Sequence, residues 1–535
     1  MTDRRNLTFE LLIVVGFCAF LFFYNLGAFG LVGADEPRYA KIAREMVETH
    51  QYVTPRLNGE PWLEKPILYY WRAAIAFKLF GVSDAAARFP SASAAFLLVI
   101  IVYFWMRRFR PGAQLDAALM VAASAMMIGY SRAASMDMHL AVTLSVAMLC
   151  WWGWHHTGRR WWLVAFYLFL AVGTLAKGPI APFLAGLIVF IYAVIRRDWK
   201  IISATLWPIG ILVFVVAAAP WFIAVQLETP SFFRTFFLEH NLERFGTGRY
   251  HHPAPFWFFI PVFVLAVLPW TTYIVAAVVD VFRDYRFRRK YQQDLGDGLT
   301  LFLFLWVVIP IVFFSFSQSK LPGYILPTVP PALILTADFL RRRMIESGQP
   351  SLVLLGIHAS LSAILIAVLL LVPAQLLKVP PTPHAMMLAS AIGIAVFFGI
   401  FLAVIARGFA ILRFVTLVPV ILGVAFLLRT VAPVIDATQS ERPVANALKA
   451  DGVAANATVA TFKARREVEY GLNWYRNQPI KVYERLEIPA GEHFVVTRIG
   501  SEPEMRDILP GRTIALIGNF PAQHLDFFRV GAAPH

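Results

Sequence analysis

Long apolar runs recur along most of this chain, and they constrain its fold more than any other feature. A helix needs about 20 apolar residues to cross a bilayer core, and runs near or above that length recur from Leu11 to Thr430. Most of them contain no charged residue. They predict an α-helical integral membrane protein of about thirteen transmembrane helices, near residues 11–29, 86–106, 114–131, 136–154, 161–176, 179–195, 201–226, 256–281, 298–316, 323–340, 351–376, 385–406 and 411–430.

The first run follows Arg4 and Arg5, so a cleaved signal peptide is an alternative interpretation of it. Because this run is long enough to cross the membrane and many others follow, we expect it to be a transmembrane helix. The only cysteines, Cys18 and Cys150, lie inside apolar runs. They predict neither a disulfide framework nor a zinc cluster.

Basic residues gather in short loops between the apolar runs. A formal net charge of +15 would suggest nucleic-acid binding in a soluble chain, but here the positive-inside rule explains it, and we expect no nucleic-acid partner. With about thirteen spans, the loops 30–85 and 227–255 and everything after Thr430 then face the outer side. The basic loops expected in the cytoplasm contain Arg107, Arg108 and Arg110; Arg159 and Arg160; Arg196, Arg197 and Lys200; Arg283 to Lys290; Arg341 to Arg343; and Arg407 with Arg413.

The pattern changes after about Val431. Strand-like segments lie near 458–462, 480–483, 494–497 and 513–517, and helix-like stretches lie at 441–450, 465–476 and 502–509. We therefore predict a transmembrane domain over residues 1–430 and a small α/β domain over residues 431–535, located in the periplasm.

The first outer loop begins with the sequence DEPRYA at residues 35–40. Asp35 is expected to cap a juxtamembrane helix, and the alternative role for Asp35 and Glu36 is capping alone. The helix is expected to lie along the membrane surface on an apolar face formed by Tyr39, Ile42, Ala43, Met46 and Val47.

Other ionisable residues lie at the predicted outer ends of spans, where an uncompensated charge is costly and a functional role is the default hypothesis. Glu64 and Lys65 precede an apolar helix, and Asp137 lies at the junction of two spans. A structural Arg132–Asp137 ion pair is the alternative for Asp137. Basic residues on this side are Lys177, Arg244 and Lys320, which favour a bound anion such as phosphate, with lipid headgroups as the alternative.

The run DEPRYA, the run LEKP at 63–66 and the run KLPGYILP at 320–327 resemble the aminoarabinose lipid A transferase family. That family belongs with the protein O-mannosyltransferases in the C-type glycosyltransferase superfamily, and the resemblance covers nearly the whole chain. It implies an inverting transfer from an undecaprenyl-phosphate sugar, usually 4-amino-4-deoxy-L-arabinose, to a phosphate of lipid A. The location implied is the bacterial inner membrane, with the active site on the periplasmic side.

The resemblance also implies roles for individual residues. Asp35 would be the principal catalytic carboxylate, assisted by Glu36 and Asp137, and the carboxylates of Asp35, Glu64 and Asp137 could hold a divalent cation. The substrate cavity would include Tyr39, Trp62 and His240. The donor phosphate would be bound by Lys65, Arg38, Arg244, Lys177, Lys320 and Tyr324.

Two other hypotheses stay open. The same donor could glycosylate another glycan, another lipid or a protein hydroxyl. From a different functional class, the chain could be a transporter of polyprenyl-linked sugars, which would need polar groups at several membrane depths and repeated halves. The acidic residues instead gather at one predicted face, and the sequence has no visible internal repeat.

Overall fold

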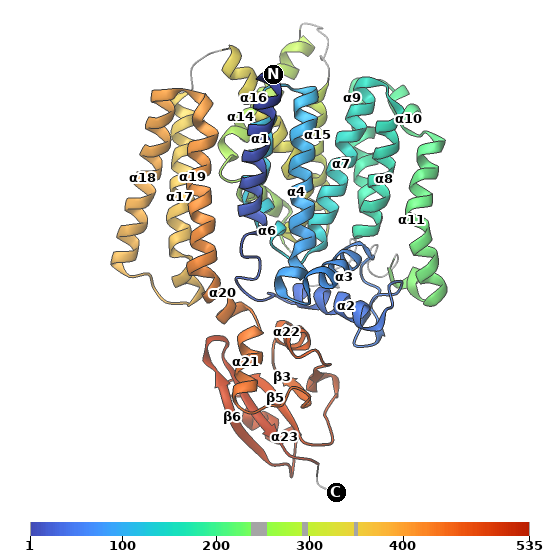
Figure 1. The fold of residues 1–535 in the computed structure, drawn as a ribbon, viewed down its shortest axis with the longest axis vertical. Coiled ribbons are helices and arrows are strands. Elements are labelled where there is room, and N and C mark those ends of the chain that lie inside the picture. The colour runs from blue at the N-terminus through green and yellow to red at the C-terminus, as the bar shows by residue number, and fades with distance from the viewer. Residues whose placement is uncertain (1, 237–253, 291–297, 347–350, 534–535) are drawn as a thin grey trace.

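The computed structural model describes residues 2–236, 254–290, 298–346 and 351–533. Long helices form one layer, and a domain that contains a sheet is attached at one end of them, as Figure 1 shows. The predicted contacts Arg244 and His240 lie outside the described residues.

Eight helical stretches of the described chain are long and apolar enough to cross a bilayer. The chain is therefore a multi-pass membrane protein, as predicted. The stretches are Asn6–Phe23 (in α1, Thr2–Cys18, and η1, Ala19–Phe23), Asp84–Phe109 (α4), Arg160–Lys177 (α8), Pro208–Glu228 (α11), Pro322–Arg343 (in η5, Pro322–Thr328, and α16, Val329–Glu346), Leu352–Leu376 (α17), Pro383–Arg407 (α18) and Phe409–Gln439 (η6, Phe409–Ile411; α19, Leu412–Phe426; η7, Leu427–Val431; α20, Ala432–Gln439).

Further helices in the same layer are shorter, bent or less apolar. The predicted span 256–281 is a pair of helical stretches that meet at 117°. These additional elements are α5 (Gln114–Ala123), α6 (Ala125–Ser131), α7 (Met136–Thr157), α9 (Ile180–Arg196), α10 (Lys200–Thr205), η4 (Phe256–Phe258), α13 (Phe259–Ala266), α14 (Thr271–Lys290) and α15 (Leu299–Ser315).

Two other predicted spans are interrupted for local reasons. The span 201–226 is divided between α10 and α11, because Trp207 precedes Pro208 and takes an extended conformation with ψ 121°. A residue before proline disfavours the helical region, so α11 begins at the proline. The span 114–131 is divided at Ser124, whose ψ is 140°.

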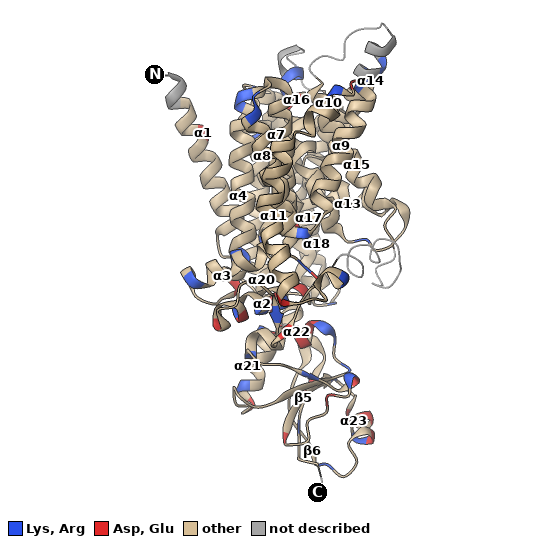
Figure 2. Cartoon of the chain, turned by 90° about the vertical axis from the view of Figure 1, so that its right-hand side faces the viewer, with Lys and Arg blue, Asp and Glu red and all other residues tan. Residues whose placement is uncertain are grey.

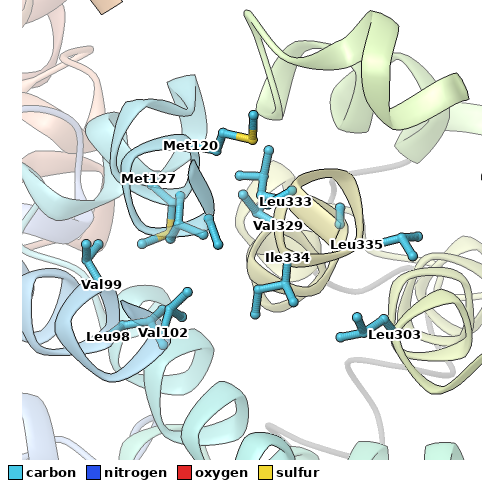
Figure 3. Packing of buried hydrophobic residues seen from close by; sticks show 14 of the residues in the cluster. Leu98, Val99, Val102, Met120, Met127, Leu303, Val329, Leu333, Ile334 and Leu335 are labelled. Carbon is cyan, nitrogen blue, oxygen red and sulfur yellow. The ribbon is translucent and has the colours of Figure 1, made fainter. Parts of the chain in front are cut away.

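The interior of the helix layer is packed with apolar side chains. Figure 3 shows residues from α4, α5, α15 and α16 that meet there, among them Val102, Met120, Leu303 and Leu333. Between α4 and α16, α5 contributes buried alanines such as Ala118. Small residues let membrane helices approach closely, which accounts for the alanine content of α5.

Charged side chains gather at the two ends of the helix layer, and the band between them is almost free of charge (Figure 2). Ion pairs join several of the expected cytoplasmic loops at one end. The nitrogen–oxygen distances are 3.1 Å for Arg110–Asp338, 2.5 Å for Arg343–Asp280 and 2.7 Å for Arg413–Asp116. The structure thus brings basic loops that are far apart in the sequence to a common end.

Two helices lie across the opposite end of the layer, α2 (Asp35–Thr49) and α3 (Leu68–Phe80), linked by a small hairpin of β1 (Arg56–Leu57) and β2 (Glu60–Pro61). The predicted apolar face of α2 is confirmed, since Tyr39, Ile42, Ala43 and Met46 are buried. The predicted cap is wrong, because Asp35 is the first helical residue and the preceding Ala34 makes no side-chain cap.

The C-terminal domain contains a five-stranded sheet in the order β4-β3-β5-β7-β6. Strand β3 pairs in parallel with β4 and β5, whereas β7 is antiparallel to β5 and β6. The prediction missed β7. Phe527 and Phe528 are adjacent and both buried, so the strand lacks the alternation of apolar and polar residues by which the other strands were located. The elements are α21 (Arg442–Ala450), β3 (Val459–Phe462), α22 (Arg466–Arg476), β4 (Lys481–Val482), η8 (Tyr483–Arg485), β5 (His493–Arg498), α23 (Glu502–Ile508), β6 (Ile514–Phe520), η9 (Pro521–Gln523) and β7 (Leu525–Val530).

The domain is held against the juxtamembrane helices through α22. Asp84, at the start of α4, accepts hydrogen bonds from Trp474 Nε1 and from the Tyr475 hydroxyl, both at 3.1 Å, and forms an ion pair with Arg442 at 3.2 Å. The ring of Trp474 stacks on Phe77 with 5.8 Å between the centroids. These buried polar and aromatic contacts fix the domain in place next to α2 and α3.

We expect Glu441 to make the stability of this domain dependent on pH. Burial raises the pKa of its carboxyl from 4.5 to about 8, against a smaller effect of Arg465 in the opposite direction. The stabilising contribution of the protonated form is therefore present below about pH 4.5 and is lost as the pH rises to about 8. At pH 8.5 the free energy of unfolding of Glu441→Gln should exceed that of the wild type by on the order of a few kcal/mol, so the variant should unfold at a higher temperature. This advantage should vanish at pH 4.5. An equal difference in unfolding temperature between the variant and the wild type at both pH values would contradict this account.

Candidate active site

A cavity of about 590 Å³ lies where α2, the segment before α3, the start of α7, the end of α8, η5 and α22 meet. The juxtamembrane helices α2 and α3 lie at one end of the helix layer, as Figure 1 shows, so the cavity is at that end. The polar and charged side chains that line it are Asp35, Glu36, Arg38, Tyr39, Glu64, Lys65, Ser135, Asp137, Lys177, Ser317, Tyr324, Arg466 and Glu467.

Arg38 is a buried cation in the wall of this cavity. Its guanidinium lies over the rings of Trp62 and Tyr470, at 4.8 and 5.2 Å from the centroids. Burial alone would lower the pKa of Arg38, but Tyr39, Asp35 and other neighbours outweigh burial and raise it. Within the described residues, Nε and Nη1 of Arg38 have no hydrogen-bond partner. A planar guanidinium with unused N–H groups is suited to binding an oxyanion.

The carboxylates of Asp35 and Glu64 both lie near Arg38. Asp35 Oδ1 is 2.5 Å from Arg38 Nη2, and Glu64 Oε2 is 3.9 Å from the same nitrogen. The side chain of Asp35 is 60% exposed, so one side of its carboxylate stays open to a reactant. Arg38 therefore orients Asp35 without covering it.

Asp137 is positioned by three segments. Its side chain forms an ion pair with Lys177 at the end of α8 and accepts a hydrogen bond of 3.1 Å from the Ser135 hydroxyl. Lys177 Nζ also lies over the ring of Tyr324, 5.0 Å from the centroid. A Cβ atom on Gly323 would lie 2.9 Å from Asp137 Cγ, so glycine is what allows η5 to approach this carboxylate. The alternative considered for Asp137, an ion pair with Arg132, is not formed, because Asp137 pairs with Lys177.

Arg132 instead donates to backbone carbonyls of the segment after α1. Its guanidinium bonds to the oxygens of Leu21, Tyr24 and Asn25 at 3.1, 2.9 and 2.9 Å. The cost of placing this arginine near the membrane is offset by carbonyl groups at the end of a helix, which need donors.

Glu36 makes contacts that favour a structural role. It forms a buried ion pair with Arg88 at 2.7 Å, and it accepts hydrogen bonds from the backbone N–H groups of Val32 and Ala134 at 2.9 and 2.6 Å. Arg88 also donates to the carbonyls of Leu26, Phe29 and Gly30. Glu36 also lines the cavity, and both of its oxygens already accept hydrogen bonds from the protein. Sequence reasoning did not single out Arg88, although a charge at the start of an apolar run was a signal for it.

Two predicted contacts lie away from the cavity surface. The ammonium of Lys320 donates to the backbone oxygen of Ser317 at 2.6 Å, and Lys320 is not part of the cavity lining. Trp62 is also absent from the lining, and its ring supports the Arg38 guanidinium from behind. Local packing decides both positions, which a sequence motif does not reveal.

Asp35, Glu64 and Asp137, named above as residues that could hold a divalent cation, do not form such a site in the described structure. Within the described residues, no group of three or more His, Cys, Asp or Glu side chains is arranged to hold a metal ion. Asp35 is compensated by Arg38 and Asp137 by Lys177, so the carboxylates already lie beside cations. The set Asp35, Glu64 and Asp137 does not fit a hard divalent cation, which prefers oxygen ligands gathered around it.

The C-terminal domain contributes to the cavity wall through Arg466 and Glu467, at the start of α22. These residues lie more than 280 positions from the other lining residues on α7 and α8, and no local pattern in the sequence pointed to them. The cavity is thus completed by a second domain.

Comparisons with known proteins agree with this architecture. The family model of dolichyl-phosphate-mannose-protein mannosyltransferases matches residues 7–236. An undecaprenyl phosphate-alpha-4-amino-4-deoxy-L-arabinose arabinosyl transferase of Aeromonas hydrophila is 31% identical over 370 residues, which is 66% of this chain and 65% of the relative. A protein of the same name from Pseudomonas aeruginosa is 29% identical over 64% of this chain and 61% of its own. The chain is similar to the aminoarabinose transferases over about two thirds of its length.

The matched part spans about 65% of the length of the Aeromonas relative of this family. The similarity in fold covers more of the chain than the similarity in sequence. The crystal structure of ArnT from Cupriavidus metallidurans bound to undecaprenyl phosphate has a TM-score of 0.78 at 23% identity, covering 98% of this chain and 99% of that chain. Its apo form has a TM-score of 0.77. The arrangement of the helix layer and the C-terminal domain is therefore common to these proteins.

The Glu36–Arg88 pair should be a major determinant of stability. Arg88→Ala leaves a buried carboxylate and three carbonyls without their donor, and we expect a loss of about 3–5 kcal/mol. Thermal unfolding of the purified protein in detergent measures this. As a control, Arg506→Ala removes an exposed ion pair on α23 and should cost less than about 1 kcal/mol. Similar losses of stability for Arg88→Ala and Arg506→Ala would show that the Glu36–Arg88 pair is not a major determinant of stability.

Proposed function

We propose that this chain is a glycosyltransferase that moves 4-amino-4-deoxy-L-arabinose from undecaprenyl phosphate to a phosphate of lipid A. The observation that carries the proposal is a cavity at the membrane edge in which the cations Arg38 and Lys177 lie beside partly open carboxylates. Two lipid-borne reactants with anionic headgroups can meet only at such an edge. The names of the relatives support the identity of the sugar and of its carrier.

We further propose the bacterial inner membrane as its location, with about thirteen spans and with the cavity and the C-terminal domain on the periplasmic side. The positive-inside rule supports this orientation, because the basic loops gather at the end opposite the cavity. The proposed division between the two domains is at residues 430 and 431. The helical path continues through this point from Leu412 to Gln439, so the domains are joined by helix.

In the proposed reaction an oxygen of the acceptor attacks the anomeric carbon of the sugar from one face. The bond between that carbon and the carrier phosphate breaks on the other face, and its electron pair leaves with the phosphate. Negative charge therefore grows on the leaving group. Arg38, Lys65 and Lys177 are the cations proposed to stabilise this charge, with Tyr324 beside Lys177 and with Arg244 as an additional contact.

The task of Asp35 depends on the acceptor. A phosphate monoester, with a second pKa of about 6, is largely ionised at neutral pH and needs no base. Asp35 would then orient the nucleophile together with Asp137, whereas a hydroxyl acceptor would need Asp35 as a general base. A transporter is disfavoured, because the charges that line the cavity lie at one membrane face rather than along a path.

We expect Asp35→Asn to lower the rate of sugar transfer by about 100-fold, since misplacing a reactant by about 1 Å has an effect of that order. Mass spectrometry of lipid A after incubation of purified enzyme with donor measures the transfer. Glu60→Gln, in the nearby hairpin but outside the cavity lining, is the matched control and should retain activity. Undiminished transfer by Asp35→Asn would refute the proposed role.

The acceptor can be tested with the same assay. Lipid A stripped of its phosphates should receive no sugar, because the nucleophile is missing. Continued transfer to this substrate would exclude the phosphate as acceptor while leaving the donor chemistry intact.

Arg38→Lys keeps the charge but loses the planar fork and the stacking on Trp62. We expect the KM for the undecaprenyl-linked donor to rise by about tenfold. The matched control is Arg44→Lys on the same helix, where Arg44 pairs with Glu48 outside the cavity lining. Equal KM values for the two variants would contradict a role of Arg38 in donor binding.

A further inference from the structure

A second cavity, of about 490 Å³, lies between the C-terminal domain and the turn that joins α17 to α18. Among the described residues that line it, every charged side chain is basic. These side chains come from both domains and are Lys378, Lys463, Arg465 and Arg498.

The strand pairing explains why the basic residues meet. Strands β3 and β5 run parallel, with Phe462 opposite Thr497, so Lys463 and Arg498 follow at the same end of the sheet. The antiparallel strand β7 begins at this end, with Leu525 opposite Arg498. One end of the sheet is therefore basic, and it is the end that faces the helix layer.

The position of this cavity matches the level of lipid headgroups. Leu376 and Leu377 end the membrane-spanning helix α17 and line the cavity, and Lys378 lies in the turn before α18. Along α17 the apolar side chains of Ile364 and Val368 are exposed, as expected for contact with lipid tails. Figure 1 shows the lower ends of α17 and α18 at the level where α20 leaves the helix layer for the domain.

The positive charge in the cavity is only partly compensated. Lys463 forms an ion pair with Glu504, which lies outside the lining. In the described part of the chain, Lys378, Arg465 and Arg498 form no ion pair. Basic side chains are disfavoured on the outer side of a membrane protein by the positive-inside rule, so a cluster of them at the bilayer surface calls for an anionic ligand.

We propose that this cavity binds the phosphate-bearing headgroup of an anionic lipid. The same chemistry is offered by a bilayer phospholipid and by a phosphorylated acceptor glycolipid. Arg465 lines this cavity while its neighbour Arg466 lines the first cavity, and neighbouring Cα atoms are about 3.8 Å apart. A headgroup held by Arg465 therefore lies next to the proposed reaction site. The binding itself does not depend on what the first cavity catalyses.

The test is lipid binding to the full-length protein in detergent, measured by native mass spectrometry. The probes are dihexanoyl phosphatidylglycerol, dihexanoyl phosphatidylcholine, phosphorylated lipid A and lipid A without phosphates. The variant Arg465→Gln/Arg498→Gln should bind an anionic probe on the order of tenfold more weakly than the wild type, with binding of phosphatidylcholine unchanged. Both arginines are exposed, so the fold should tolerate their replacement.

The matched control is Arg506→Gln/Arg529→Gln, which removes the same charge elsewhere in the domain. Arg529 pairs with Glu492 at the opposite end of the sheet, where Val530 is opposite His493. Lys378→Asn is a second, independent variant in the other domain. Its residue has a φ of 55°, a conformation that asparagine adopts readily, so the turn should be retained.

A weaker affinity for phosphatidylglycerol supports a site for bilayer phospholipid, and a loss confined to phosphorylated lipid A supports a site for the acceptor. Equal affinities of the Arg465/Arg498 variant and its control for all four probes would overturn the proposal. An equal loss for phosphatidylcholine would also overturn it, because the effect would then not depend on headgroup charge.

Discussion

The buried ion pair between Glu36 and Arg88 is the interaction on which the arrangement of the cavity depends. Arg88 at the start of α4 holds the carbonyls of the segment 26–30, and Glu36 holds the backbone ahead of α7 through Ala134. Asp35 and Arg38 lie one and two positions from Glu36, so fixing Glu36 fixes the orientation of α2 and of these two cavity-lining residues. The cost of burying two charges is offset because every oxygen and nitrogen of the two charged groups has at least one hydrogen-bond partner.

The bilayer explains why the remaining charges lie where they do. A charged side chain is tolerated at the ends of the helix layer, where partners and water are at hand, and is costly between them. Asp137, Lys177 and Arg132 illustrate this, since each lies at an end of a helix and is compensated by a side chain or by carbonyl groups. Residues of distant segments therefore converge without any local signal that links them.

Much of the fold could be predicted from the sequence, because its signals are local. Apolar length identified a multi-pass membrane protein, the spacing of Tyr39, Ile42 and Met46 gave the buried face of α2, and alternation located β3 and β5. The interruptions at Ser124 and Trp207 were missed because apolar runs continue through them.

For the site, the motif DEPRYA pointed to Asp35 and Arg38, which line the cavity. Arg88, Arg466 and the partner of Asp137 could not be assigned, since tertiary contacts between distant segments determine them. Lys320 shows the converse case: its motif pointed to the cavity, but a bond to a nearby carbonyl holds it elsewhere.

The helix that runs without a break from Leu412 to Gln439 carries the C-terminal domain, and α22 of that domain closes part of the cavity. The domain is joined to the helix layer by helix and is also bonded to Asp84, so two connections hold it against this part of the cavity. In the proposed transfer, reactants anchored in the bilayer would arrive sideways, by diffusion in a plane. Their supply would then be set by the number of molecules per unit area of membrane, in the way that bulk concentration sets the supply for a soluble enzyme.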